Sequence, residues 1–111
     1  MLTPSKNLIR MDLAPVAILK LEADDLASRY PDCVQDDTDN LDHRRGVFFH
    51  LDKTVPLALL RHDGDPQDTM TLYVSLPDSG KAPAVLAGIV NSVVRHLGLT
   101  PDSILWQSRT T

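Results

Sequence analysis

The sequence predicts an α+β domain, a two-layer sandwich whose elements follow in the order helix, three antiparallel strands, helix, strand. Three observations support this prediction: an apolar stripe of helical period in the last third of the chain, a strictly alternating strand before it, and turn residues that divide the middle into short segments. The 111 residues fit a single domain (1–111). A chain of this length buries roughly two-thirds of its unfolded surface without help from metals or disulfides.

Residues 13–30 are predicted to form the first helix, because apolar side chains recur there at helical spacing with charged side chains between them. Asp12 stands where a helix cap belongs, Pro15 is tolerated in a first turn, and Pro31 ends the segment. The alternative is a buried strand at "VAILKLE" followed by a short helix.

Three strands are predicted next, at residues 46–52, 54–62 and 69–76. A tight turn at Asp52-Lys53 joins the first two, and "HDGDPQD", dense in turn residues, joins the second to the third. Apolar and polar side chains alternate along the third strand, which predicts one buried sheet face and one that meets water or a partner.

The second helix is predicted within residues 81–98, where six apolar residues form an unbroken stripe. Ser79 is a candidate cap, Pro83 falls in the first turn, and Gly98 stands where a helix ends. Residues 103–108, "SILWQS", are predicted to close the sheet as a short strand.

The acidic segment 31–45 is predicted to be a hydrated loop, in which Arg44 and Arg45 offset part of the negative charge. A calcium loop that started at Asp37 would need glycine at Asp42 and a bidentate acid at Phe48. We therefore expect no metal site and no cofactor.

Nucleophilic and zinc chemistry find little support in the sequence. Cys33 is the single cysteine, and the four histidines lack the pair spacing of structural zinc sites. A Cys33–His43 pair would lie in one flexible loop, so an ordinary thiol is expected. No nucleophile elbow, phosphate loop or dinucleotide fingerprint occurs, and we expect no catalytic residues.

The charge pattern argues against nucleic acid as a partner. Fifteen acidic residues against eleven lysines and arginines give a net charge of −4, and Arg44-Arg45 is the sole basic candidate patch. The apolar run "LAPVAIL" is seven residues long, which is too short for a signal peptide or a membrane span. We expect a cytoplasmic protein that binds neither nucleic acid nor membrane.

The predicted contact surface for a protein partner is the sheet face that carries Phe48 and Tyr73. The acidic segment flanks it, with Asp36, Asp37, Asp39 and Asp42. The alternative is that this face is covered by the first helix or by the N-terminal arm "LTPSKNLIRM".

The block from Gly46 to Gly80, "GVFFHLDKTVPLALLRHDGDPQDTMTLYVSLPDSG", resembles the strand region of class I type III secretion chaperones. The resemblance lies in element order, size and acidity. It implies a cytoplasmic homodimer without enzymatic activity that holds the extended N-terminal segment of an effector across its surface.

Two other functions stay open. An immunity or antidote protein would use the aspartates to mimic phosphate and to steer a basic toxin. Residues 72–99 resemble the acyl-CoA-binding segment of GNAT acyltransferases, where backbone amides at a helix start hold the pyrophosphate. In that resemblance Gly80 and Ala82 match turn positions of the family.

Overall fold

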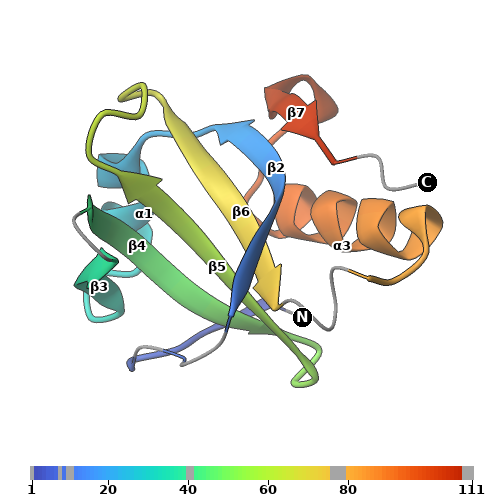
Figure 1. Cartoon of the computed structure of the whole chain (residues 1–111), viewed down its shortest axis with the longest axis horizontal. Helices are drawn as coiled ribbons and strands as arrows, with labels where there is room; N and C mark the ends of the chain where they lie inside the picture. The colour runs from blue at the N-terminus through green and yellow to red at the C-terminus, as the bar shows by residue number, and fades with distance from the viewer. Residues whose placement is uncertain (1, 8, 10–11, 40–41, 76–79, 109–111) are drawn as a thin grey trace.

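The computed structural model describes residues 2–7, 9, 12–39, 42–75 and 80–108, with the backbone alone at 37–39 and 42 (Figure 1). Two helices and a seven-stranded antiparallel sheet confirm the α+β class. The strands are β1 (Leu2–Pro4), β2 (Leu13–Lys20), β3 (Val34–Asp39), β4 (Asp42–Leu51), β5 (Val55–His62), β6 (Thr69–Ser75) and β7 (Ile104–Gln107). The helices are α1 (Ala23–Arg29) and α3 (Pro83–His96), and a short 3-10 helix, η1 (Pro101–Ser103), precedes β7.

The sheet has the strand order β1-β4-β5-β6-β2-β7, and β3 also pairs with β4. Strand β4 is shared along its outer edge, because β3 pairs with residues 42–47 and β1 pairs with residues 49–51. Strands β4, β5 and β6 are consecutive, whereas β2 lies between β6 and β7 and is antiparallel to both.

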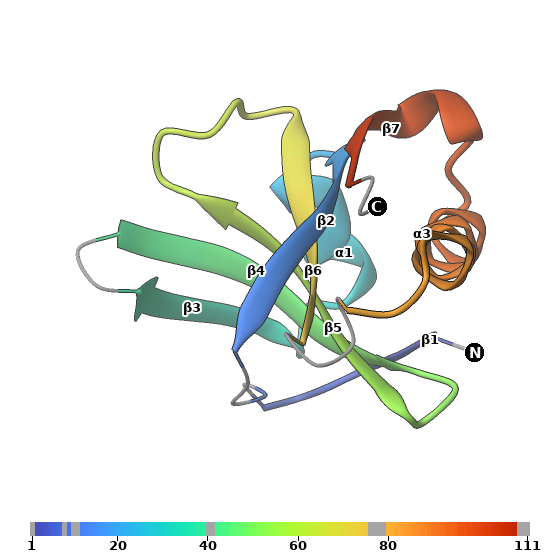
Figure 2. The ribbon, with the colours of Figure 1, turned by 45° about the vertical axis from the view of Figure 1, so that its right-hand side comes forward.

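Both helices cover the same face of the twisted sheet (Figure 2). Helix α3 contributes five buried apolar side chains from one stripe, and α1 contributes Leu26. The sheet side of this core is formed by Val16, Ala17, Leu19, Val47, Phe49, Leu51, Leu57, Leu59, Met70, Leu72 and Val74. An Arg29 guanidinium N–H donates to the Leu97 carbonyl, which ties α1 to the end of α3.

The prediction of one helix over residues 13–30 is wrong, and the alternative of a strand followed by a short helix is correct. The register of β2 against β6 shifts between Pro15 and Ala17, so Val16 is inserted and both Val16 and Ala17 are buried. This bulge gives a strand an apolar spacing that imitates a helix. Proline, which lacks an N–H donor, is suited to such a position.

The predicted loop at 31–45 is also wrong, since β3 and the first residues of β4 form a hairpin there. In the backbone register Asp36 is opposite Arg45 and Asp37 is opposite Arg44, whereas Asp39 is opposite Asp42. Opposite charges at directly opposite positions favour strand pairing. The predicted element order is therefore wrong as well, because three strands, β1, β2 and β3, are absent from it and the chain begins with strands.

The remaining elements follow the sequence patterns closely. Strands β5, β6 and β7 and helix α3 lie within or near their predicted ranges. Asp52 and Lys53 have φ values of 52° and 65°, as the tight turn between β4 and β5 requires. Gly98 follows α3 at φ 70°, where it allows the Leu99 N–H to reach the Val94 carbonyl. Ser79 lies outside the described residues, and Ala82 precedes α3 without a side-chain cap.

Gly46→Ala should destabilise the fold strongly, because a Cβ there would lie 1.8 Å from the Leu59 carbonyl oxygen of the neighbouring strand. We expect a loss of at least about 3 kcal/mol in the free energy of unfolding, the upper end of the range for overpacking. Gly88→Ala is the control, because a Cβ at this exposed position of α3 meets no atom within 4 Å. It should stabilise by about 0.5–1 kcal/mol. Urea denaturation measures both, and equal stabilities would contradict this account.

Candidate functional site

The sheet face that the helices leave uncovered carries a shallow hollow of about 370 Å³. We call it the Tyr73–Trp106 surface, and it is lined by Pro15, Ile18, His62, Asp65, Thr71, Tyr73 and Trp106. Two aromatic rings and two aliphatic side chains form most of it, with an imidazole, a carboxylate and a hydroxyl beside them. Hollows of this composition are typical of binding sites for other molecules.

Strand register gathers these side chains from elements far apart in the sequence. Thr71 of β6 is opposite Ile18 of β2, and Ile18 is opposite Trp106 of β7. The register of β7 shifts between its pairs at Ile104 and Trp106, which leaves Leu105 as the extra residue of a bulge. Ile104 packs against the core, whereas Trp106 lines the uncovered face and is 45% exposed.

His62 and Tyr73 form the edge of this surface nearest β5. Their ring centroids are 6.1 Å apart with the planes at 62°, and the Tyr73 hydroxyl lies 3.5 Å from His62 Nδ1. The backbone N–H of His62 donates to Asp65 Oδ2 at 3.0 Å, which fixes the start of the β5–β6 loop. The Tyr73 ring therefore lies edge-on to the His62 imidazole beside the hollow.

Phe48 does not lie on an exposed surface, so the expectation that it is accessible to a partner is wrong. It is 1% exposed and forms a small second core with Ala58 and Leu60, against which Ile9 and Leu13 pack. The N-terminal arm therefore covers this part of the face, as the alternative predicted. Tyr73 packs at the border of this second core and also lines the open hollow, which agrees with its predicted position.

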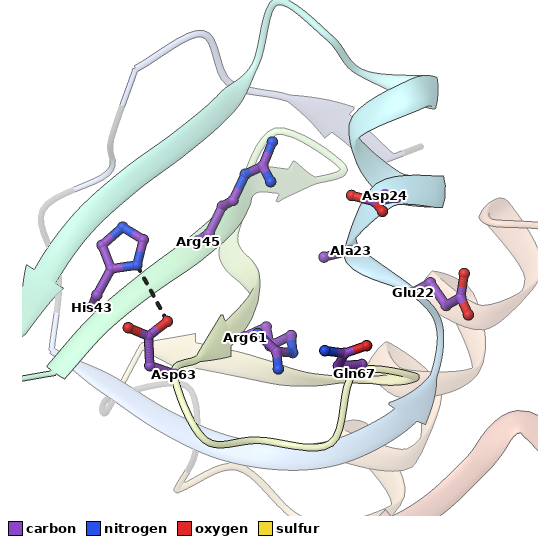
Figure 3. A pocket seen from close by; sticks show the side chains of 8 residues that line it. All are labelled: Glu22, Ala23, Asp24, His43, Arg45, Arg61, Asp63 and Gln67. Atoms are coloured by element: carbon purple, nitrogen blue, oxygen red, sulfur yellow. Dashed lines mark hydrogen bonds and ion pairs between the residues drawn. The ribbon is translucent and has the colours of Figure 1, made fainter.

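A second hollow of about 580 Å³ lies on the other face of the sheet, beside the start of α1 (Figure 3). We call it the Arg45–Arg61 cleft. Its lining residues are Glu22, Ala23, Asp24, His43, Arg45, Arg61, Asp63 and Gln67. Strand alternation places His43 and Arg45 on the same face as the core residues Val47 and Phe49, but beyond the end of the apolar region.

Two of the charged side chains that line the cleft, His43 and Arg61, have polar contacts with neighbouring side chains or backbone. His43 Nε2 lies 3.0 Å from Asp36 Oδ1, and His43 Nδ1 lies 3.4 Å from Asp63 Oδ1. Arg61 Nη2 donates to the Asp65 carbonyl at 2.7 Å. Arg45 and Arg61 are directly opposite each other in the register of β4 and β5.

Of the four predicted contact aspartates, Asp36 is the one whose side chain the structure describes, and it does not lie beside Tyr73. Asp36 contacts His43 on the face that carries the helices, whereas Tyr73 lines the opposite face. Asp37 pairs in backbone register with Arg44, and Asp39 pairs with Asp42. The side chains of Asp37, Asp39 and Asp42 lie outside the described part of the structure.

Cys33 is a buried free thiol in the main core. His43 contacts carboxylates instead, so the considered Cys33–His43 pair is not among the contacts of either residue. In the described ranges, no group of three or more His, Cys, Asp or Glu side chains is placed to hold a metal ion. No helix in the described part of the chain has the length and apolar character needed to cross a membrane.

No known protein family, no curated protein and no solved structure matches the chain. The resemblance to class I type III secretion chaperones therefore stays a prediction. The same holds for the acyltransferase resemblance, for which turn residues 76–79 lie outside the described residues. The Tyr73–Trp106 surface and the Arg45–Arg61 cleft are the structural features on which a functional proposal can be based.

His43→Gln should cost at most about 1 kcal/mol of unfolding free energy, because the contacts of His43 are solvent-exposed. The side chains of His43, Asp36 and Asp63 are 46%, 60% and 71% exposed. A double-mutant cycle with Asp36→Asn, followed by urea denaturation, measures the coupling between the two side chains. A coupling energy well above about 1 kcal/mol would contradict this expectation and would mean that the contact between His43 and Asp36 stabilises the hairpin substantially.

Proposed function

We propose that the chain is a non-enzymatic protein-binding domain that holds an extended segment of a partner polypeptide across the Tyr73–Trp106 surface. The observation that carries the proposal is Trp106, which is 45% exposed and lines the same hollow as Tyr73 on the uncovered sheet face. Tryptophan and tyrosine dominate binding energy at protein interfaces, where they bury a large rigid area at a low entropic cost.

An extended segment is favoured over a folded surface because the hollow borders the end strand of the sheet. Among the described strands, β7 pairs with β2 alone, so its other edge is available for main-chain hydrogen bonds. Leu105 on β7 is 53% exposed. A polypeptide added beside β7 would gain main-chain bonds from the edge and side-chain contacts from Leu105 and Trp106.

The antidote alternative receives less support from the hairpin β3–β4. Asp36 is opposite Arg45 in the strand register and its carboxylate contacts His43, so this described aspartate lies among cationic partners. Opposite charges at this spacing cancel much of each other's field at distances of a Debye length. A phosphate-mimicking surface needs an unbalanced negative field.

Trp106→Ala should weaken partner binding by about 30-fold or more, the range of an interface hot spot, with little change in melting temperature. Native mass spectrometry of the chain purified from its own cells identifies the bound polypeptide and shows whether the complex holds one copy or two. Calorimetry with that polypeptide then compares the variants. Val85→Ala is the matched control, since Val85 is 47% exposed on α3. Equal affinities for the two variants would remove this surface from the interface.

Replacing Asp36, Asp37, Asp39 and Asp42 with asparagine should leave the association rate with the same partner almost unchanged. An antidote that steers a basic toxin would instead lose about tenfold or more in association rate and most of its salt dependence. Stopped-flow measurements at low and high salt distinguish the two functions.

A further inference from the structure

We infer that the Arg45–Arg61 cleft is a second binding site, for a ligand that carries both a carboxylate and an amine cation. This inference does not rest on the proposed function, because the cleft and the Tyr73–Trp106 surface lie on opposite faces of the sheet and share no lining residue.

Two arginines form a like-charge pair in the sheet. Arg45 and Arg61 are directly opposite each other on β4 and β5, and both line the cleft. Like charges directly opposite each other destabilise a sheet. A ligand carboxylate in the cleft would offset part of this repulsion, and a guanidinium group on either strand can donate hydrogen bonds to it. Figure 3 shows the Arg45 guanidinium toward α1 and the Arg61 guanidinium toward the β5–β6 loop.

The guanidinium group of Arg61 is already oriented by hydrogen bonds within the protein. Arg61 donates from Nη2 to the Asp65 carbonyl at 2.7 Å, and its Nε lies 3.4 Å from the Pro66 carbonyl. The Thr69 hydroxyl donates to that same Pro66 carbonyl at 3.0 Å. The β5–β6 loop therefore holds Arg61 in place, which lowers the entropy lost when a ligand binds.

A carboxylate in the cleft lining could bind the amine of the ligand. Asp24 lines the cleft from α1, and Figure 3 shows its carboxylate on the side facing Arg45. Asp63 Oδ1 lies 3.4 Å from His43 Nδ1, so that carboxylate already has a polar partner. Asp24 would repel a dianion such as phosphate but would attract an amine on the same ligand as the carboxylate. Charge complementarity thus selects a dipolar ligand.

The size of the cleft fits this chemistry. About 580 Å³ is within the usual range of small-ligand sites, and it admits an amino acid or a few residues of a peptide. A free amino acid and an acidic–basic pair of side chains on a polypeptide present the same two groups. A polypeptide would also place backbone atoms in the cleft beside its charged side chains, whereas a free amino acid would not.

The test is an NMR titration of the full chain with three probes of one carbon skeleton: 6-aminohexanoate, hexanoate and hexylammonium. We expect 6-aminohexanoate to shift the amides of Arg45, Arg61 and Gln67 and to bind at least about threefold tighter than either single-charge probe. Inorganic phosphate should bind more weakly than hexanoate. A capped peptide, acetyl-Lys-Gly-Gly-Glu-amide, distinguishes the sources: tighter binding than 6-aminohexanoate indicates a polypeptide ligand, and weaker binding indicates a free amino acid.

Matched variants connect the binding to the named residues. Arg45→Gln should weaken the binding of 6-aminohexanoate and hexanoate about tenfold, and Arg45→Lys should weaken their binding less. Asp24→Asn should reduce 6-aminohexanoate to the affinity of hexanoate, whereas Asp25→Asn, its neighbour outside the cleft lining, should change nothing. The amide spectrum of each variant reports that it is folded. The inference is overturned if no probe shifts these amides, if phosphate binds tightest, or if folded Arg45→Gln binds as well as the original chain.

Discussion

Strand β4 is paired along both of its edges, and the rest of the molecule depends on this arrangement. On one side it pairs with β5 over eight residues in register, from Arg44 to Leu51. On the other side it pairs with β3 and then with β1, two segments separated in the chain by β2 and α1. Gly46 allows the closest approach to β5, where any side chain would meet the backbone of Leu59. Every hydrogen bond of this strand that fixes the register also fixes which side chains reach each face.

Alternation along β4 and β5 distributes the side chains between two cores and two hollows. One set forms the main core with Val47 and Phe49 and continues into the cleft as Arg45 and His43. The other set forms the second core around Phe48 and continues as His62 of β5 into the open hollow, which Tyr73 of β6 also lines. Since strands have a period of two residues, a single strand supplies both faces at no extra cost in chain length.

The β5–β6 loop connects the two hollows mechanically. Arg61, Asp63 and Gln67 line the cleft, whereas His62 and Asp65 line the Tyr73–Trp106 surface. Asp65 takes part in both arrangements, because its carboxylate accepts from the His62 N–H and its carbonyl accepts from Arg61. The backbone and the side chain of this one loop residue therefore contact β5 residues that line opposite faces of the sheet.

The local pattern of the chain determined the α+β class, the positions of β5, β6 and α3, and the half-open placement of Tyr73. Each of these follows from a regular period or a turn residue, which neighbouring residues specify without distant partners. Tertiary structure decided the rest. The bulge at Val16 buries two consecutive residues and gave β2 a helix-like pattern. Pairing with β4 made a strand of the acidic segment, and Leu13 of β2 together with Ile9 of the N-terminal arm packs against the cluster that contains Phe48. The bulge at Leu105 turned Trp106 toward the open face, against simple alternation from Ile104. In all four cases the deciding contact comes from another strand, and register between strands is a property that no short window of sequence contains.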